Sequence, residues 1–330
     1  MSVRTIRVEP WAPEYGSSHE SQPQAPSDAV IDVDAELPAA AWRPLDPRPE
    51  TPPARRVHVI DGVRRIDARV WITGSDGVTR MGICASYAAG AVRCQHDQAS
   101  ITAVEVRRGL FAPAAAAPDE EASLMTRAGA YPFLTVAGDD VDQLSLGLQQ
   151  RMGELEVAVA ARALTNPGPE DRSQPACDGT PDLIVVDGPL NGRQNVSGAI
   201  GYVKTHRVAY LPPALGEIVP RLQPGQRSPL FLTQTSWSRF SWYLRLPGGE
   251  GHPWAGIVRC EASADLPPAA ARALADRSAR TLPRFASAAH KDPRAPQNLY
   301  PIGGLERELR RRLGDPAHVE RALRAAVCGG

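Results

Sequence analysis

The stretch Leu183–Gly188, which reads LIVVDG, says more about the fold than any other part of the sequence. Its four consecutive apolar residues do not alternate with polar ones, and such runs are typical of parallel strands covered on both faces. The run ends in Asp187-Gly188, a pair that favours a turn. The stretch therefore predicts a central strand of an α/β sheet with an aspartate at its carboxyl end.

A similar stretch lies much earlier in the chain, where Val59–Gly62 reads VIDG. The β-branched run before it predicts a strand that meets a turn at Asp61-Gly62. If the two strands lie side by side, Asp61 and Asp187 converge at one edge of the sheet. Neighbouring carboxylates repel each other unless a cation neutralises them, and oxygen ligands select hard ions such as Mg²⁺ or Mn²⁺. The alternative for either Asp-Gly pair is a simple turn, which is its commoner use after a strand.

The segments around these stretches predict a sheet with flanking helices. Alternating apolar residues predict strands at 66–73, 81–87 and 101–106, which indicate an antiparallel meander. Apolar residues at helical spacing predict a helix from about residue 141 to 163. After the central strand we expect strands at 200–204, 239–246 and 254–261, and helices at 266–282 and 304–313. A meander, a helix and then a buried strand predict an α/β fold with a mixed central sheet flanked by helices, the order found in RNase H-like domains.

Composition narrows the class of protein. Residues 1–54 are rich in Pro, Ser, Glu and Ala and predict a disordered or loosely packed segment, whereas residues 55–330 predict one domain. The 37 basic and 37 acidic residues argue against binding to nucleic acid by bulk charge, but they allow a local basic groove. Five cysteines without a CxxC pair argue against a zinc ribbon or a disulfide framework. Neither a secretory signal nor an apolar run of ~20 residues is evident, and we expect a cytoplasmic protein.

Five short motifs, in family order, resemble those of NurA-type nucleases. They are DGVRR (Asp61–Arg65), LIVVDGPL (Leu183–Leu190), GYVKT (Gly201–Thr205), WYLRL (Trp242–Leu246) and Tyr300-Pro301. Each motif is short, so the ordered set carries the resemblance. It implies an RNase H-like fold and metal-dependent endo- and exonuclease action on DNA, with Mn²⁺ (or Mg²⁺) as the cofactor. It also implies a homodimer that works alongside a HerA-type hexameric ATPase in DNA end processing, repair or defence.

The resemblance also implies a set of metal ligands. Carried over to this sequence, it makes Asp61 and Asp187 metal ligands and asks for a third ligand from a glutamate of the intervening helix. Glu154 and Glu156 are the candidates. Glu156 is favoured because it lies on the inward face of that helix, between two apolar positions, and Glu154 stays open. A solvated helix acid is the alternative for each of them.

Other positions are expected to handle the phosphate and the nucleic acid. Lys204 would neutralise charge on the scissile phosphate or position the attacking water, and an ordinary surface lysine is its alternative. Aromatic and basic residues that interleave on a strand could stack bases and contact phosphates of a single strand, although aromatic residues on strands more often belong to the core. The expected DNA contacts are Arg64, His206, Arg239, Trp242, Tyr243, Arg245 and Tyr300.

The chain departs from the family pattern at two positions. Val63 stands where the first motif usually carries a small hydroxyl residue, and valine cannot hydrogen-bond a phosphate. Glu308 stands where the last segment commonly places a histidine ligand, and a carboxylate can also bind Mn²⁺. An ion pair with Arg312 on a surface helix is the other interpretation of Glu308. These departures motivate a second hypothesis, a catalytically weakened subunit that binds DNA or an ATPase without cutting.

Overall fold

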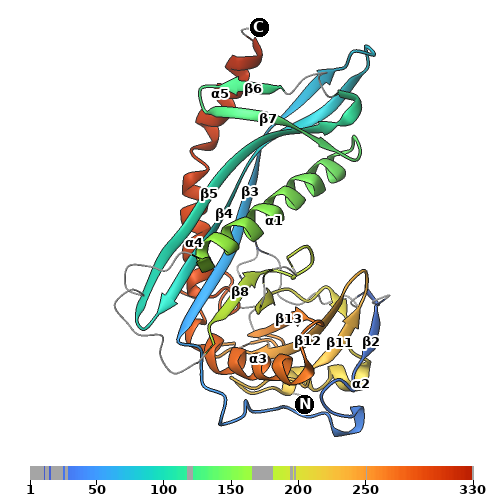
Figure 1. Ribbon diagram of the computed structural model, residues 1–330, viewed down its shortest axis with the longest axis vertical. Coiled ribbons are helices and arrows are strands. Elements are labelled where there is room, and N and C mark those ends of the chain that lie inside the picture. Colours follow the sequence, from blue (N-terminus) through green and yellow to red (C-terminus); the bar gives the residue numbers. More distant parts are fainter. Residues whose placement is uncertain are drawn as a thin grey trace, which may run out of the picture. The chain divides into compact units, whose positions relative to one another are not determined.

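The computed structural model describes residues 29–116, 122–165, 181–193, 198–249 and 251–328, together with Trp11, Tyr15, Ala25, Pro26 and Val196. A mixed sheet of eleven strands is flanked by helices (Figure 1), which confirms the α/β fold with a mixed central sheet. The predicted loop at 166–180 lies outside the described residues. Cys84, Cys94 and Cys260 are free and buried.

The strands of the large sheet follow the order β2-β11-β12-β13-β9-β8-β3-β4-β5-β7-β6. Their bounds are Val30–Asp32 (β2), Arg56–Thr73 (β3), Thr79–Gln95 (β4), Gln98–Pro113 (β5), Ser123–Thr126 (β6), Gly129–Val136 (β7), Leu183–Asp187 (β8), Ala199–Val203 (β9), Phe231–Gln234 (β11), Ser238–Arg245 (β12) and Ile257–Ser263 (β13). The short strands β1 (Ala25–Pro26) and β10 (Val208–Ala209) pair with each other. The α-helices are Val141–Thr165 (α1), Pro213–Gly216 (α2), Pro268–Thr281 (α3), Tyr300–Arg312 (α4) and Pro316–Cys328 (α5).

The middle of the sheet has the element order expected from the sequence. β3, β4 and β5 are neighbours in both chain and sheet, α1 follows them, and β8 then lies next to β3. β8 runs parallel to β9, with Val185 opposite Ile200. The apolar residues of β8 are buried, as expected for a parallel strand covered on both faces. The chain also forms β6, β7 and α5, which the sequence pattern did not predict.

One predicted turn is wrong. Asp61-Gly62 does not end a strand, because β3 continues through both residues to Thr73. It merges the strand expected before Asp61 with the strand expected at 66–73. Gly62 has a different role here. A Cβ atom at this position would lie 2.4 Å from Oε1 of Glu156 and 3.0 Å from Cγ of Met152. Glycine therefore lets α1 approach β3 closely, which a side chain at this position would prevent.

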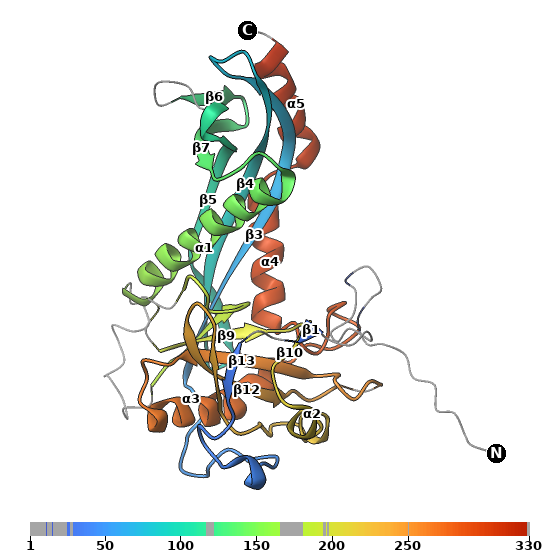
Figure 2. The ribbon, with the colours of Figure 1, turned by 90° about the vertical axis from the view of Figure 1, so that its right-hand side faces the viewer.

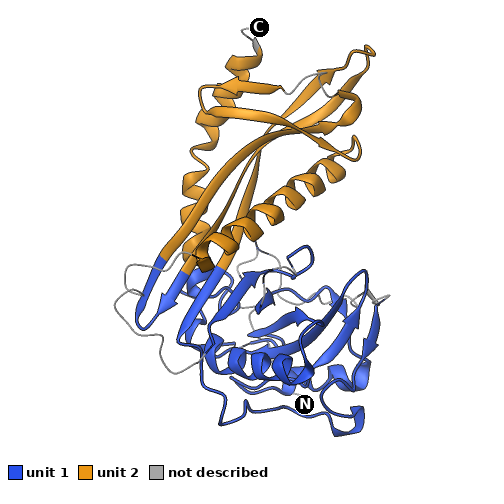
Figure 3. Ribbon diagram, in the orientation of Figure 1, with its two compact units in different colours: residues 1–59, 93–100, 170–303 blue, residues 60–92, 101–169, 304–330 orange. Residues whose placement is uncertain are grey.

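The chain divides into two compact units, shown in Figure 3. Unit 1 comprises residues 1–59, 93–100 and 170–303. Its core includes Trp42, Phe231, Tyr243 and Ile257, so part of the proline-rich segment before residue 55 packs against this core. β12 pairs on its two sides with β11 and β13, and Trp242 donates from Nε1 to Oγ of Ser278 on α3, at 3.1 Å.

Unit 2 comprises residues 60–92, 101–169 and 304–330. Figures 1 and 2 show its long strands between α1 on one face and α4 with α5 on the other. Val319 and Leu323 of α5 share a buried cluster with Cys84 and Tyr131 of the sheet. A Cβ atom at Gly90 of β4 would lie 2.8 Å from Leu305 of α4, so this glycine also admits a helix close to the sheet. No helix in the described residues is both long and apolar enough to cross a membrane.

Candidate metal centre

Asp187 occupies the carboxyl end of β8. Gly188 has φ +87°, a left-handed conformation that glycine adopts without steric cost. The backbone N–H groups of Gly188 and Tyr202 each donate to the other residue's carbonyl oxygen, at 2.9 Å. The strand end predicted at Asp187 is confirmed, but in place of the predicted turn Gly188 forms a backbone bridge with Tyr202. This bridge fastens this strand end to β9, so the Asp187 carboxyl group has a fixed place.

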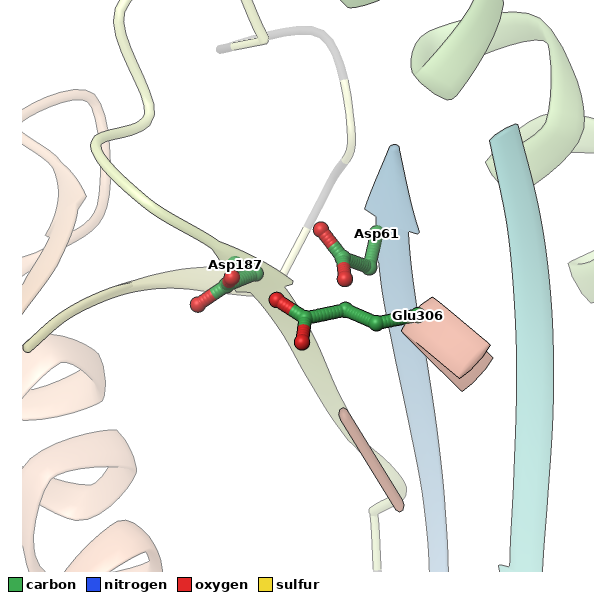
Figure 4. Close-up of side chains that lie close together, drawn as sticks. All are labelled: Asp61, Asp187 and Glu306. Carbon is green, nitrogen blue, oxygen red and sulfur yellow. The ribbon is translucent and has the colours of Figure 1, made fainter. Parts of the chain in front are cut away.

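Asp61 lies in β3, the neighbour of β8 in the sheet, and is buried. Its Oδ1 accepts a hydrogen bond from the N–H of Gly62 at 2.8 Å. The structure brings Asp61 and Asp187 together with a third acid, Glu306 of α4. Each offers one carboxylate oxygen, and the three oxygens lie within 4.8 Å of one another (Figure 4).

This donor set fits a hard divalent cation. Carboxylate oxygens bind Mg²⁺ or Ca²⁺ at about 2.0 to 2.6 Å, so two ligands on opposite sides of one ion lie about 4 to 5 Å apart. Three carboxylates at this spacing repel one another, and a shared cation removes that repulsion. Oδ1 of Asp187 is buried and has no hydrogen-bond partner among the described residues. Its burial without a donor makes it a suitable ligand atom.

The two candidate glutamates of α1 have different surroundings. Glu156 is only 2% exposed. Its Oε1 lies 2.4 Å from the position that a Cβ atom of Gly62 would occupy, one residue beyond Asp61. Glu154 is exposed and forms an ion pair with Arg151 at 3.0 Å. The inward-facing position expected for Glu156 is therefore confirmed. The metal-binding role of Glu156 stays a prediction.

Glu308 lies outside the acidic group. Its carboxylate accepts hydrogen bonds from Arg311 at 2.7 Å and from Arg312 at 2.8 Å. These arginines lower the pKa of Glu308 to about 2. Glu306 is the residue that joins the group, because two helical positions lie about 200° apart around the axis and face opposite sides. Counting residues from Tyr300-Pro301 could not distinguish them, whereas the helical face could have.

Lys204, the predicted phosphate-handling lysine, lies beside Asp187. Its Nζ donates to Oδ2 of Asp187 at 2.7 Å and to Oδ1 of Asn298 at 3.1 Å. Sequence reasoning did not single out Asn298. The two groups of the ion pair are largely buried, with side-chain exposures of 10% and 13%. The lysine is therefore a fixed part of this centre and not a solvated surface residue.

The predicted DNA-contacting residues on β12 are buried in unit 1. They are Arg239, Trp242, Tyr243 and Arg245. Trp242 and Tyr243 lie on β12, which has neighbours on both sides, and both rings are buried. Arg239 donates to Glu261 at 3.0 Å, and Arg245 donates to the carbonyl of Ala255 at 2.7 Å. The prediction that bases stack on these rings is therefore wrong for the folded protein, because both rings are packed inside the core.

Of the other residues predicted to contact DNA, His206 is buried, whereas Arg64 and Tyr300 are exposed. His206 is buried, and its Nε2 lies 3.0 Å from the carbonyl oxygen of Ile257, so the expectation of a surface position is wrong. Val63 is also buried, so the side chain at that position faces protein and not phosphate. Tyr300 is 40% exposed, and Arg64 is exposed with Nη1 donating to the carbonyl of Ser145. Only these two keep a surface position from which they could reach a nucleic acid.

Two nucleases are among the solved structures to which the chain is similar. The NurA nuclease from Sulfolobus solfataricus has 11% sequence identity and a TM-score of 0.44, and the match covers 82% of this chain and 84% of that chain. An endonuclease V from Bacillus subtilis has 10% identity and a TM-score of 0.33, with 80% of this chain and 85% of that chain covered. No family model matches the chain, and no curated protein matches it.

Proposed function

We propose that the protein is a divalent-cation-dependent nuclease that hydrolyses phosphodiester bonds of DNA. The observation that carries the proposal is the convergence of Asp61, Asp187 and Glu306 from two neighbouring strands and a helix. The acids fit a hard cation, and the ordered motifs that resemble NurA-type nucleases point to DNA as the substrate.

The three acids would hold the cation, and Glu156 adds a buried carboxyl group close to Asp61. When bound, the cation would polarise a phosphoryl oxygen and lower the pKa of a bound water molecule. Lys204 contributes a fixed positive charge beside Asp187, where an anionic phosphate would approach the acids. Arg64 and Tyr300 are the exposed candidates for contacts with the nucleic acid.

The finer assignments rest on the motif resemblance alone. We propose Mn²⁺, with Mg²⁺ as the substitute, as the cofactor. The same resemblance proposes a homodimer, a HerA-like hexameric ATPase as partner and a cytoplasmic location. It also proposes that residues 55–330 form the nuclease domain. Copurification with such an ATPase and light scattering of the purified protein test the two assembly proposals.

Substitution of the acids tests the nuclease proposal. Asp61→Asn, Asp187→Asn and Glu306→Gln each remove a charged ligand while preserving size. Each should lower Mn²⁺-dependent cleavage of single-stranded or duplex DNA by more than the ~100-fold typical of outer-shell changes. Rates are measured on end-labelled DNA over a Mn²⁺ titration.

Glu308→Gln provides the matched control, because Glu308 lies on the same helix but pairs with Arg311 and Arg312. It should leave the cleavage rate close to that of the wild-type protein. A wild-type protein that cuts neither form of DNA with Mn²⁺ or Mg²⁺ contradicts the proposal. So does a rate that none of the three substitutions changes.

One observation favours a second candidate, a weakened subunit that binds DNA or the ATPase without cutting. The ammonium of Lys204 lies 2.7 Å from Asp187 and already supplies part of the positive charge that the acids need. Calorimetric titration with Mn²⁺ separates the two candidates. Binding of Mn²⁺ together with cleavage supports the nuclease, whereas DNA binding without either supports the weakened subunit.

A further inference from the structure

The two oxygens of Asp187 have different surroundings within unit 1. Oδ2 accepts a hydrogen bond from Nζ of Lys204, whereas Oδ1 is buried and lacks a hydrogen-bond partner among the described residues. A lysine ammonium on a flexible stem could contact either oxygen. Something must therefore keep the ammonium on one side if the other oxygen is to serve a cation.

Asn298 provides that restraint. Its Oδ1 accepts a second hydrogen bond from Nζ of Lys204 at 3.1 Å, beside the one that Oδ2 of Asp187 accepts. Asn298 is only 1% exposed, so its amide has no freedom to exchange this bond for water. The ammonium is held between one carboxylate oxygen and one amide oxygen.

Asp292 determines which way the amide of Asn298 points. Nδ2 of Asn298 donates to Oδ2 of Asp292 at 2.8 Å. If the amide were reversed, its NH₂ group would face the ammonium and its oxygen would face a carboxylate, which places donor against donor and acceptor against acceptor. Oδ1 of Asp292 in turn accepts from the N–H of Arg294 at 2.9 Å, which fixes this carboxylate.

The segment that carries Asn298 is itself fastened to the strand beside Asp187. Tyr202 lies opposite Asp187 in the β8–β9 register. Its hydroxyl donates to the carbonyl of Gln297 at 2.6 Å. Thus the contacts of Lys204 with Asn298 and of Tyr202 with Gln297 join the same two segments. The network has the rigidity that positioning a charged group requires.

We propose that Asn298, oriented by Asp292, is a positioning residue of the metal centre. It holds the ammonium of Lys204 against Oδ2 of Asp187 and so reserves Oδ1 for the cation. The inference rests on the proposed function, since it assigns Asp187 as a cation ligand. Without Asn298 the ammonium can move to hydrogen-bond either oxygen of Asp187, and at Oδ1 it competes with the cation.

The test measures metal affinity on the full-length protein without DNA. Asn298→Ala should weaken Mn²⁺ binding by about 10-fold in isothermal titration calorimetry, the lower end of outer-shell effects. In cleavage assays at a fixed Mn²⁺ concentration, kcat should fall while the KM for DNA stays unchanged. Raising the Mn²⁺ concentration should recover much of the lost kcat.

A rescue variant separates positioning from simple loss of structure. Asn298→Asp alone places a second carboxylate against Asp292 and should weaken Mn²⁺ binding. Adding Asp292→Asn exchanges the two side chains, so that the new amide donates to the new carboxylate, which still accepts from Lys204. The double variant should bind Mn²⁺ more tightly than Asn298→Asp and close to the wild-type value.

Gln297→Leu is the matched control, because Gln297 is equally buried in the same segment but accepts from Trp11 and not from Lys204. It should lower the Tm without changing Mn²⁺ affinity. If Asn298→Ala lowers the Tm like this control and binds Mn²⁺ as the wild-type protein does, the inference is overturned and the proposed function stands. Absence of Mn²⁺ binding by the wild-type protein overturns both.

Discussion

At the scale of single residues, Gly62 and Gly188 follow the two aspartates in the same way but do different work. Gly188 adopts φ +87°, a left-handed conformation, directly after the last residue of β8. Gly62 has no left-handed φ, and its missing side chain makes room for Glu156. Identical Asp-Gly pairs therefore arose from two different physical requirements, one conformational and one steric.

Gly62→Ala tests the steric requirement. Its Cβ would lie 2.4 Å from Oε1 of Glu156, so the helix or the strand must shift, and overpacking of this kind typically costs about 1 to 3 kcal/mol. We expect the free energy of unfolding in urea to fall by that amount, with lower Mn²⁺ affinity because Glu156 and Asp61 are displaced. Gly153→Ala is the control on α1, where a Cβ meets nothing within 4 Å. It should stabilise the helix by up to about 1 kcal/mol, and equal effects of both substitutions would refute the steric explanation.

At the scale of elements, α1 combines packing with chemistry. Leu144, Leu148, Leu155 and Val159 are buried on one side of the helix, and Glu156 shares that buried side with them. The apolar residues hold the helix on the sheet, and this contact keeps the glutamate beside β3. Helix α4 works similarly, since Leu305 and Leu309 are buried while Glu306 between them reaches the acidic group.

Leu148→Ala measures how firmly α1 is held. Leu148 is fully buried, and removing a buried leucine side chain typically costs about 2 to 5 kcal/mol. Leu146, two positions earlier, is 64% exposed, and its replacement by alanine should change the free energy of unfolding by less than about 0.5 kcal/mol. Urea denaturation of both variants, followed by circular dichroism, gives the comparison. Similar losses in the two variants would show that the helix packs through a different face.

At the scale of the whole molecule, zero net charge coexists with a local concentration of acids. The 37 basic and 37 acidic residues balance overall, yet Asp61, Asp187 and Glu306 gather their carboxylates in one place. Such a cluster opposes folding unless its charge is compensated. Lys204 compensates part of this charge, and the proposed cation would compensate the rest.

The folded protein should therefore gain stability from Mn²⁺. A ligand that binds only the folded state adds about 2.7 kcal/mol at a concentration of 100 times its Kd. We expect the Tm to rise with Mn²⁺ in differential scanning calorimetry and to return to its starting value after chelation with EDTA. Asp187→Asn should show a much smaller rise. A Tm that does not depend on Mn²⁺, or that rises equally in the variant, would place any cation elsewhere.

The amino-acid sequence by itself predicted the central strand with its terminal aspartate and the long helix that precedes it. The unbroken apolar run of β8, the periodicity of α1 and the strand end at Asp187 are local patterns, and local patterns fix local structure. Only the tertiary structure decided which of these residues meet. It made Asp61-Gly62 part of one long strand and brought Glu306, not Glu308, to the acidic group. It also buried Trp242 and Tyr243 and placed Asn298, which Asp292 contacts, beside Lys204. The reason is physical, because convergence depends on which helical face and which strand neighbour each residue obtains, and contacts between distant segments set both.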